Sequence, residues 1–357
     1  MSEAPAITGS GRALSALRIG AFSGTSGEWD EFVRSQPGWT HFHLSGWRRV
    51  MEHALGHECL YLCARDGDGE LEGVLPLVRV KSALFGHFLV SVPFLNYGGP
   101  LGSEHAVRAL ASHAVCLARR DEVKLLELRS RHEQPLDLAV SHRKVTTVLD
   151  LVPGDAEAVF SAVPRSLRNR IRKAQKSGVV VEFGADQIGG FHEVFSRHMR
   201  FLGTPTHGRR LFEEIAATFP DDSIFACAYL GDRPVAAGAG FQWNGEFEIT
   251  WASALREFDD AKPNMGLYWA LIERAANAGC HTFNFGRSTP NSGTHEFKKH
   301  WGSRDEPLYW YEFSPSGEAA ATPSPKDSSY SWGPRIWKKL PLALTRALGP
   351  RIVRLIP

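Results

Sequence analysis

One order of elements occurs twice along the chain, and this repeat constrains the fold more than any other feature. In each half, two apolar runs joined by a turn with Asp and Gly are followed by a third apolar run, a helix and a last strand. These last strands read LELRS and FNFGRS, and they end at Arg129-Ser130 and Arg287-Ser288. Hairpins combined with strand–helix–strand units predict mixed sheets covered by helices. We therefore expect an α/β (α+β) chain built from two tandem domains with mixed central sheets.

The chain is long enough for two such domains, because its 357 residues include 43% hydrophobic and 22% charged residues. A net charge of +2 argues against a uniformly basic nucleic-acid binder. The composition changes after Phe313 to a stretch rich in Ser, Pro and Ala, which is typical of a linker. We expect a disordered tail at 1–16, domains at 17–150 and 151–313, the linker at 314–331 and a basic amphipathic tail at 332–357.

The sequence predicts neither a membrane span nor a metal site. No apolar run reaches the length needed to cross a bilayer, and the N-terminus lacks the apolar core of a signal peptide. The five cysteines form no CxxC pair, which favours buried thiols in a reducing compartment over zinc ligands. P-loop, GxSxG and HExxH motifs are missing, and no GxGxxG opens a helix after a strand. We expect a cytoplasmic protein with no metal and no tightly bound cofactor.

The segment FNFGRSTPNSGTHEFKKHWG, residues 283–302, is the strongest candidate for a functional site. Its first residues alternate as in a strand, Gly286 ends that strand, and Ser292 or Thr294 can cap a short helix. Such a crossing presents a cation, hydroxyls and free backbone N–H groups at one sheet edge, which suits an anionic or acyl ligand. The side chains concerned are Arg287, Ser288, Phe297 and Lys298.

A helix predicted over residues 165–177 carries six cations and no acid. Its apolar stripe is formed by Leu167, Ile171 and Ala174, and Arg168 and Arg172 lie on a shared face with Arg165. Two interpretations remain open. The cations form an ordinary solvated face, or they form a surface that meets phosphates or RNA.

Three further segments supply polar groups near strand ends or helix starts. Residues 262–266 lie between a strand and a helix. Backbone N–H groups there either bind a phosphate or pyrophosphate, or they belong to an ordinary helix entrance. Residues 198–207 join two helices through a tight turn that is either structural or part of a ligand site. The first half has a strand end at 96–99 that either lines a cleft or merely turns the chain. The candidate residues are Asn264, Gly266, Arg200, Thr204, His207, Asn96 and Tyr97.

The C-terminal segment WGPRIWKKLPLALTRALGPRIVRLIP mixes large apolar residues with six cations and contains no acid. A basic amphipathic tail of this kind suits an anionic membrane surface or an acidic partner groove. The other interpretation is a terminal element that packs on the protein's own surface. Pro341 and Pro350 argue against one long helix.

Together, RNRIRKAQKSGV, RFLGTPTHGRR, NMGLYWALIERAANAG, the 283–302 segment and the two-unit layout resemble the FemAB family. More narrowly, they resemble its branch associated with exosortase/PEP-CTERM and exopolysaccharide systems. The resemblance covers roughly residues 21–313 and implies two tandem GNAT-like domains of the acyl-CoA N-acyltransferase type. Founding members transfer amino acids from aminoacyl-tRNA to the amine of a cell-wall peptide precursor. This chain lacks the coiled-coil arm that some of them insert, which leaves both aminoacyl-tRNA and acyl-CoA open as the donor.

The resemblance also implies roles for particular residues. The family's Phe-Lys pair at the transfer site matches Phe297-Lys298, so Lys298 is the expected catalytic residue that stabilises negative charge on the oxyanion or the leaving group. Arg287 would hold a phosphate or carboxylate through a bidentate contact. Phe297 and Tyr268 would wall the pocket, and Arg168 and Arg172 would meet the donor's phosphates. Lys298 as a plain surface lysine beside Lys299 is the competing interpretation.

Three functions compete at this point. The first is a Fem-like acyl- or aminoacyltransferase that forms an amide on an envelope or exopolysaccharide precursor, with tRNA as a partner. The second is an acyl-CoA-dependent N-acetyltransferase that acts on a small amine. The third is a non-catalytic protein that touches the inner membrane through its tail and organises polysaccharide assembly.

Overall fold

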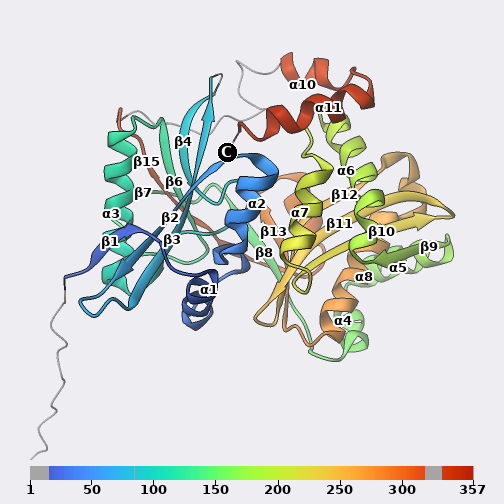
Figure 1. Ribbon diagram of the computed structural model, residues 1–357. Helices are drawn as coiled ribbons and strands as arrows, with labels where there is room; N and C mark the ends of the chain where they lie inside the picture. The colour runs from blue at the N-terminus through green and yellow to red at the C-terminus, as the bar shows by residue number, and fades with distance from the viewer. Residues whose placement is uncertain (1–15, 84, 318–331, 357) are drawn as a thin grey trace, which may run out of the picture.

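The computed structural model describes residues 16–83, 85–317 and 332–356, which form two mixed sheets lying side by side with helices around them (Figure 1). The first sheet has the order β1-β2-β3-β4-β6-β15-β7, with β5 paired to β3. Its strands are β1 (Arg18–Ala21), β2 (Glu58–Arg65), β3 (Leu71–Ser82), β4 (Gly86–Ser91), β5 (Leu101–Gly102), β6 (Leu125–Ser130), β7 (Ala139–Ser141) and β15 (Tyr309–Phe313).

The second sheet has the order β14-β8-β13-β12-β11-β10-β9. Its strands are β8 (Val145–Asp150), β9 (Val179–Phe183), β10 (Ser223–Leu230), β11 (Arg233–Trp243), β12 (Glu246–Ala254), β13 (Thr282–Ser288) and β14 (Arg304–Pro307). The helices are α1 (Ser26–Ser35), α2 (Gly46–Leu55), α3 (Glu104–Arg120), α4 (Ala156–Ala162), α5 (Arg165–Lys176), α6 (Ile188–Leu202), α7 (Arg209–Thr218), α8 (Pro263–Asn277), α9 (Gly293–Lys299), α10 (Trp332–Trp337) and α11 (Leu342–Val353), with short 3-10 helices η1 (His41–His43), η2 (Ala185–Gln187) and η3 (Arg256–Ala261).

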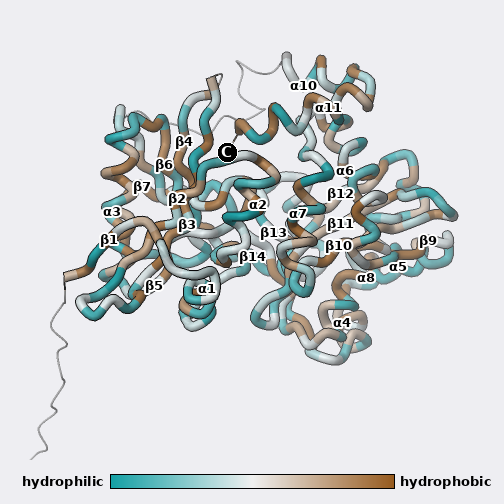
Figure 2. The backbone as a smooth tube through the Cα atoms, viewed as in Figure 1, coloured by the Kyte–Doolittle hydropathy of each residue, from teal (hydrophilic) through white to brown (hydrophobic). Residues whose placement is uncertain are grey.

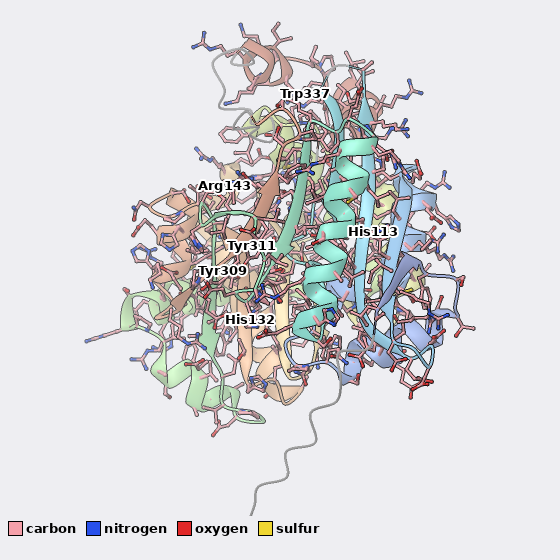
Figure 3. The ribbon with its side chains drawn as sticks, turned by 90° about the vertical axis from the view of Figure 1, so that its left-hand side faces the viewer. His113, His132, Arg143, Tyr309, Tyr311 and Trp337 are labelled. Atoms are coloured by element: carbon pink, nitrogen blue, oxygen red, sulfur yellow. The ribbon has the colours of Figure 1, made fainter. Side chains whose placement is uncertain are left out.

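The repeat expected from the sequence is present in both sheets. The β2–β3 hairpin, β4, α3 and β6 correspond to the β10–β11 hairpin, β12, α8 and β13. In each copy the strands on either side of the helix pair in parallel, β4 with β6 and β12 with β13. Helix α3 begins where the Ser103 side chain accepts a hydrogen bond from the N–H of Ala106. Figure 3 shows α3, which carries His113, lying across one face of the first sheet.

The two sheets exchange one strand each, and the sequence did not predict this exchange. Strand β8, placed in the first domain by a boundary at 150, lies between β13 and β14 of the second sheet. Strand β15, placed in the second domain by a boundary at 313, lies between β6 and β7 of the first sheet. Both strands are short, and the hydrogen-bond partner of a short strand is decided by the sheet edge that it reaches. The boundaries at 150 and 313 therefore do not separate the two sheets.

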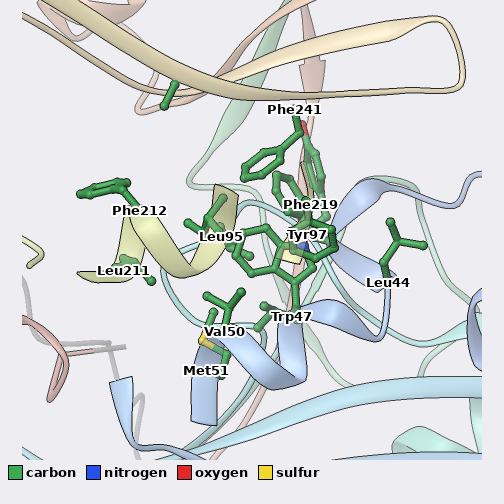
Figure 4. Packing of buried hydrophobic residues seen from close by; sticks show 14 of the residues in the cluster. Leu44, Trp47, Val50, Met51, Leu95, Tyr97, Leu211, Phe212, Phe219 and Phe241 are labelled. Atoms are coloured by element: carbon green, nitrogen blue, oxygen red, sulfur yellow. The ribbon is translucent and has the colours of Figure 1, made fainter. Parts of the chain in front are cut away.

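An aromatic core joins the two halves. Figure 4 shows Trp47 of α2 packed beside Phe219 and Phe241 of the second half. The Trp47 ring lies 5.3 Å from the Phe219 ring and 5.2 Å from the Phe241 ring, between centroids. The His41 ring stacks on Phe241 at 4.5 Å. Each fully buried ring of this size stabilises the fold by roughly 1.5–3 kcal/mol, so this core holds the halves together.

The C-terminal segment packs on the protein's own surface, which is one of the two interpretations left open above. Helix α11 lies on α6, where Arg346 donates to Ser196 at 2.9 Å and to Glu193 at 2.5 Å. The Arg200 guanidinium donates to the carbonyl of Leu340 at 2.6 Å. Trp337, labelled in Figure 3, is buried. Nearly all of the expected tail at 1–16 and linker at 314–331 lies outside the described residues.

Four of the five cysteines are buried as expected, whereas Cys116 is exposed. Among the residues that the structure describes, no group of three or more His, Cys, Asp or Glu side chains is placed to hold a metal ion. No helix in that part of the chain is both long enough and apolar enough to cross a membrane.

Candidate functional site

A cavity of about 610 Å³ opens where β12 and β13 diverge. These parallel strands pair only through Glu246–Glu248 and Thr282–Asn284. Beyond that point β12 continues to Ala254 along β11, and a bulge at Thr250 shifts its register. The diverging strand leaves backbone groups of residues 249–254 along one wall of the cavity. A parallel sheet opened in this way is a common location for a ligand site in α/β folds.

Aromatic side chains form a second wall. Tyr268 of α8 stacks on Phe285 of β13 with 5.8 Å between ring centroids, and it meets Phe297 of α9 edge-on at 5.0 Å. Asn264, in the first turn of α8, lines the cavity beside them. The positive end of the α8 dipole therefore faces the same space. This wall combines an apolar surface for an acyl chain with a helix start suited to a negative charge.

Lys298 lies at the cavity and is 7% exposed. Its ammonium donates to the carbonyl of Gly286 at 2.7 Å and to that of Arg287 at 3.0 Å. Ser292 caps α9 by accepting from the N–H of His295, and Gly286 turns the chain at φ +69°, so the lysine points back to its own strand. Burial lowers the pKa of Lys298 to about 7, although the Glu248 carboxylate opposes this decrease. The side chain can therefore gain or lose a proton near neutral pH.

Glu248 of β12 is fully buried behind the cavity wall. Its Oε1 accepts a hydrogen bond from Nδ2 of Asn96 at 2.5 Å, and its Oε2 has no hydrogen-bond partner among the described residues. Burial raises the pKa of Glu248 to about 8, with a further contribution from the Glu246 carboxylate. Two groups with pKa values near neutrality, Glu248 and Lys298, thus lie close enough to influence each other electrostatically.

The two repeated Arg-Ser strand ends meet at one point between the halves. Arg129 and Arg287 both donate to the carbonyl of Leu95, at 3.0 and 2.9 Å, and both lie over the ring of Trp310. Arg129 is paired with Glu127 at 2.6 Å. Within the described residues, no carboxylate lies within ion-pair distance of Arg287. Burial lowers the pKa of Arg287 to about 10, and the nearby Arg129 adds to that effect.

A loop of the first half completes the site. Val92 and Phe94 adopt positive φ values of 50° and 71°, which large side chains rarely do. This backbone brings Phe94 and Asn96 into the cavity wall. The next residue, Tyr97, accepts a hydrogen bond from Asn284 of β13 at 3.1 Å. The site is therefore built from both halves of the chain.

The structure brings half of the predicted site residues together. The cavity is lined by Lys298, Arg287, Phe297, Tyr268, Asn264, His207 and Asn96. Ser288 and Tyr97 are buried next to lining residues without facing the cavity themselves. The remaining five, which do not line this cavity, are Gly266, Arg168, Arg172, Arg200 and Thr204.

Each displaced residue has a physical reason for its position. Helix α5 packs its apolar stripe against α8, so its arginines point elsewhere, and Arg172 lies over the ring of Phe160. Gly266 faces Ala174 and Val179, where a Cβ would come within 3.3 Å of both. Arg200 binds the tail, as described above. Thr204 follows the C-cap of α6, and its N–H donates to the carbonyl of Met199.

The sequence interpretation missed several residues of the site. Glu248 was the most informative of them, because an acid inside the apolar strand FEITWASA signals a buried carboxylate. His198 of α6 lines the cavity, and its ring nitrogen lies 3.1 Å from the carbonyl of Ala254. The other missed lining residues include Phe94, Phe195, Met199, Trp251, Arg256 and Asp259.

Comparison with known proteins supports this architecture. Residues 161–299 match the acetyltransferase (GNAT) domain family. The structure of FemX superposes with a TM-score of 0.60 at 17% identity, covering 83% of this chain and 97% of FemX. A tandem GNAT protein from the clavulanic acid biosynthesis pathway superposes with a TM-score of 0.52 at 14% identity, covering 85% of this chain and all of that protein.

A third similar structure is that of L-PGS from Bacillus licheniformis, with a TM-score of 0.53, 11% identity and coverage of 93% of this chain and 99% of that one. No curated protein matches the chain by sequence. The matched region contains β12, α8, β13 and α9, which form much of the cavity wall. The chain therefore has a Fem-like tandem GNAT fold, with the match to the GNAT domain family lying in its second half.

Proposed function

We propose that the chain is a Fem-like acyl- or aminoacyltransferase that forms an amide on an amine of a cell-envelope or exopolysaccharide precursor. The observation that carries this proposal is the cavity between the diverging strands β12 and β13, with Lys298 held inside it. The cavity has backbone groups on one side and aromatic rings on the other, which suits an acyl group. We also propose that the chain acts in the cytoplasm and belongs to the exosortase/PEP-CTERM branch that its motifs resemble.

The proposed reaction needs no protein nucleophile. The acceptor amine attacks the carbonyl carbon of the donor ester, so that a C–N bond forms and the C–O bond to the carrier breaks. The proton lost by the amine ends on the carrier oxygen. Two of the three N–H groups of protonated Lys298 are bound to backbone carbonyls, which leaves one to stabilise the oxyanion. With a pKa near 7, Lys298 also suits the transfer of that proton.

Glu248 acts through Lys298 in this proposal. It is fully buried, and Asn96 separates it from the cavity on one side, so it is a positioning residue. When ionised, its carboxylate raises the pKa of Lys298 and keeps the ammonium charged at higher pH. Arg287 has the opposite effect on Lys298 and offers a guanidinium to an anionic part of either substrate.

Two donors are supported by different observations. The six cations of α5 make no ion pair among the described residues, and a polyanion such as tRNA would satisfy them. The first turn of α8 at the cavity instead suits the pyrophosphate of an acyl-CoA. For the thioester the bond that breaks is C–S, and the proton ends on sulfur. The acyl-CoA-dependent N-acetyltransferase is therefore our second candidate.

Incubation with labelled aminoacyl-tRNA and with labelled acetyl-CoA, each with a panel of amine acceptors, tests the proposal. We expect the label to appear in an amide with one donor and to be lost when Lys298 is replaced by Met. Absence of transfer from both donors to every acceptor would contradict the proposal and favour a non-catalytic protein that organises polysaccharide assembly.

A further inference from the structure

Large apolar side chains gather on the outside of the protein around α10. Among the described residues, seven large hydrophobic side chains are exposed, and four of them belong to the end of α6 and to α10 and α11. Figure 2 shows apolar and polar segments alternating along α10 and α11. The four exposed apolar residues are Phe201, Leu202, Ile336 and Leu344. A soluble monomer exposes single apolar residues everywhere, whereas a cluster marks an interaction surface.

Contacts between the elements join the end of α6 to α10 and to the residues that follow it. The residue after Leu202, Gly203, lies against Pro334 of α10, where an added Cβ would overlap the proline. The ammonium of Lys338 lies 5.9 Å from the centre of the Phe201 ring. We call Phe201, Leu202, Ile336 and Leu344, together with Arg335, Lys338 and Lys339, the basic apolar surface.

The charge on this surface has one sign. Residues 332–357 contain no Asp or Glu. Arg335, Lys338 and Lys339 are exposed, and they have no carboxylate within ion-pair distance in the described ranges. Of the other cations in this segment, Arg346 is paired with Glu193. Glu257, beside α6, is paired with Arg197 of that helix. An unpaired positive surface with apolar side chains among the charges complements a negative, partly apolar partner.

One residue connects this surface to the cavity. The guanidinium of Arg256 lies 4.5 Å from the centre of the Phe201 ring, and Arg256 also lines the cavity. His198 and Met199, one turn before Phe201 on α6, line the cavity as well. The basic apolar surface therefore borders the cavity at Arg256 and the last turns of α6.

We propose that the basic apolar surface seats the protein on an anionic lipid bilayer, with Phe201, Leu202, Ile336 and Leu344 at the level of the lipid head groups. Seated in this way, the cavity lies next to the membrane. The binding to lipid stands apart from the proposed function. An acidic groove on a partner protein would also match the charge of the basic apolar surface. The boundary of a bilayer fits better, because the surface mixes apolar and cationic side chains from α10, α11 and the end of α6.

Sedimentation of the full chain with vesicles tests the lipid binding without any activity assay. We expect binding to vesicles of mixed phosphatidylglycerol and phosphatidylcholine, little binding to phosphatidylcholine alone, and weaker binding as salt increases. Replacing both lysines, Lys338→Gln with Lys339→Gln, lowers the partition coefficient by about 30-fold at low salt. Replacing Phe201→Ser with Ile336→Ser lowers it by at least about tenfold.

Matched controls come from exposed residues elsewhere on the second half. Lys173→Gln with Lys176→Gln removes two unpaired lysines from α5, and Val180→Ser removes a side chain that is 58% exposed on β9. We expect both controls to bind vesicles within about twofold of the wild type. Equal losses from the α5 pair and from the Lys338 and Lys339 pair, or no binding to anionic vesicles, would overturn the proposal. The transfer assay with a soluble acceptor is unaffected by Lys338→Gln with Lys339→Gln, which separates this test from that of the proposed function.

Discussion

The comparison of Lys298→Met with Lys299→Met separates the proposed transfer residue from its neighbour. Lys298 is buried and donates to two carbonyls, whereas Lys299 is 36% exposed and lies 3.5 Å from Asp305. Methionine keeps the length of either side chain and removes its charge. We expect Lys298→Met to lower the rate of acyl transfer by about 10²–10³-fold, the loss typical of an oxyanion donor. Lys299→Met should change the rate by less than about twofold.

The structure also gives the direction of the change in stability. The pKa of Lys298 falls from 10.5 to about 7 in the folded chain, which at pH 7 corresponds to a cost on the order of 5 kcal/mol for holding the charge inside. Lys298→Met avoids this cost. It also leaves the carbonyls of Gly286 and Arg287 without their hydrogen bonds to the lysine, which lowers stability by about 1–3 kcal/mol for each carbonyl. Because the folded pKa is depressed, wild-type stability decreases as pH falls from about 10.5 towards 7. Lys298→Met has no charge at this position and lacks this decrease. Its stability relative to the wild type therefore increases as pH falls from about 10.5 to about 7.

The assay is a single-turnover transfer measurement at several pH values, with urea unfolding of the same samples. A catalytic role predicts a large rate loss with a free energy of unfolding that changes by no more than about 3 kcal/mol at pH 7. Equal, small rate effects for the two variants would refute the assignment of Lys298. A rate loss that merely follows the unfolded fraction would refute it as well.

Three other predictions concern buried charge and the connection of the halves. Glu248→Gln should raise the melting temperature by several degrees at pH 9 and much less at pH 5. The raised pKa of Glu248 makes the folded wild type lose stability as pH rises from about 4.5 to about 8, and above that window the loss is complete. A shift that is equal at both pH values would contradict this. Arg131→Met breaks ion pairs to Glu246 and Glu306 at 2.7 and 3.0 Å, and we expect it to lower the free energy of unfolding in urea by about 3–5 kcal/mol. The control Arg120→Met removes an exposed ion pair and should lower it by less than about 1 kcal/mol. Similar losses for the two variants would contradict this prediction. Because β8 and β15 are exchanged and an aromatic core joins the halves, calorimetry should show a single unfolding transition, and two separate transitions would disprove that coupling.

The repeated unit could be predicted from the sequence because its signals are local. Turns with Asp and Gly, helices of similar length and the Arg-Ser strand ends identify each copy without reference to the other. The exchange of β8 and β15 could not be predicted in this way. VTTVLD and YWYEF have the pattern of short strands, and nothing local in them selects one sheet edge over another.

Site residues that lie close together in one segment could be predicted from the sequence. Site residues whose environment depends on contacts between distant segments could not. Phe297 and Lys298 follow directly from the loop after Gly286, and the structure places both at the cavity. Arg168 was expected to contact the donor. The apolar stripe of α5 packs against α8 and so determines which face of α5 is buried, and Arg168 does not line the cavity. Burial raises the pKa of Glu248, and the hydrogen bond from Asn96, more than 150 residues away in the sequence, opposes that increase, so the environment of this carboxyl group is visible only in the folded chain.

A co-crystal structure with a donor analogue whose acyl link cannot be cleaved tests the central claim most directly. Amide analogues of both an aminoacyl-tRNA end and an acyl-CoA are suitable probes. We expect the acyl group of one of them to lie between β12 and β13, against residues 249–254, with its carbonyl oxygen within about 3.2 Å of Nζ of Lys298. An acyl group bound elsewhere on the protein, with this cavity free of donor, would contradict the proposed transfer site at Lys298.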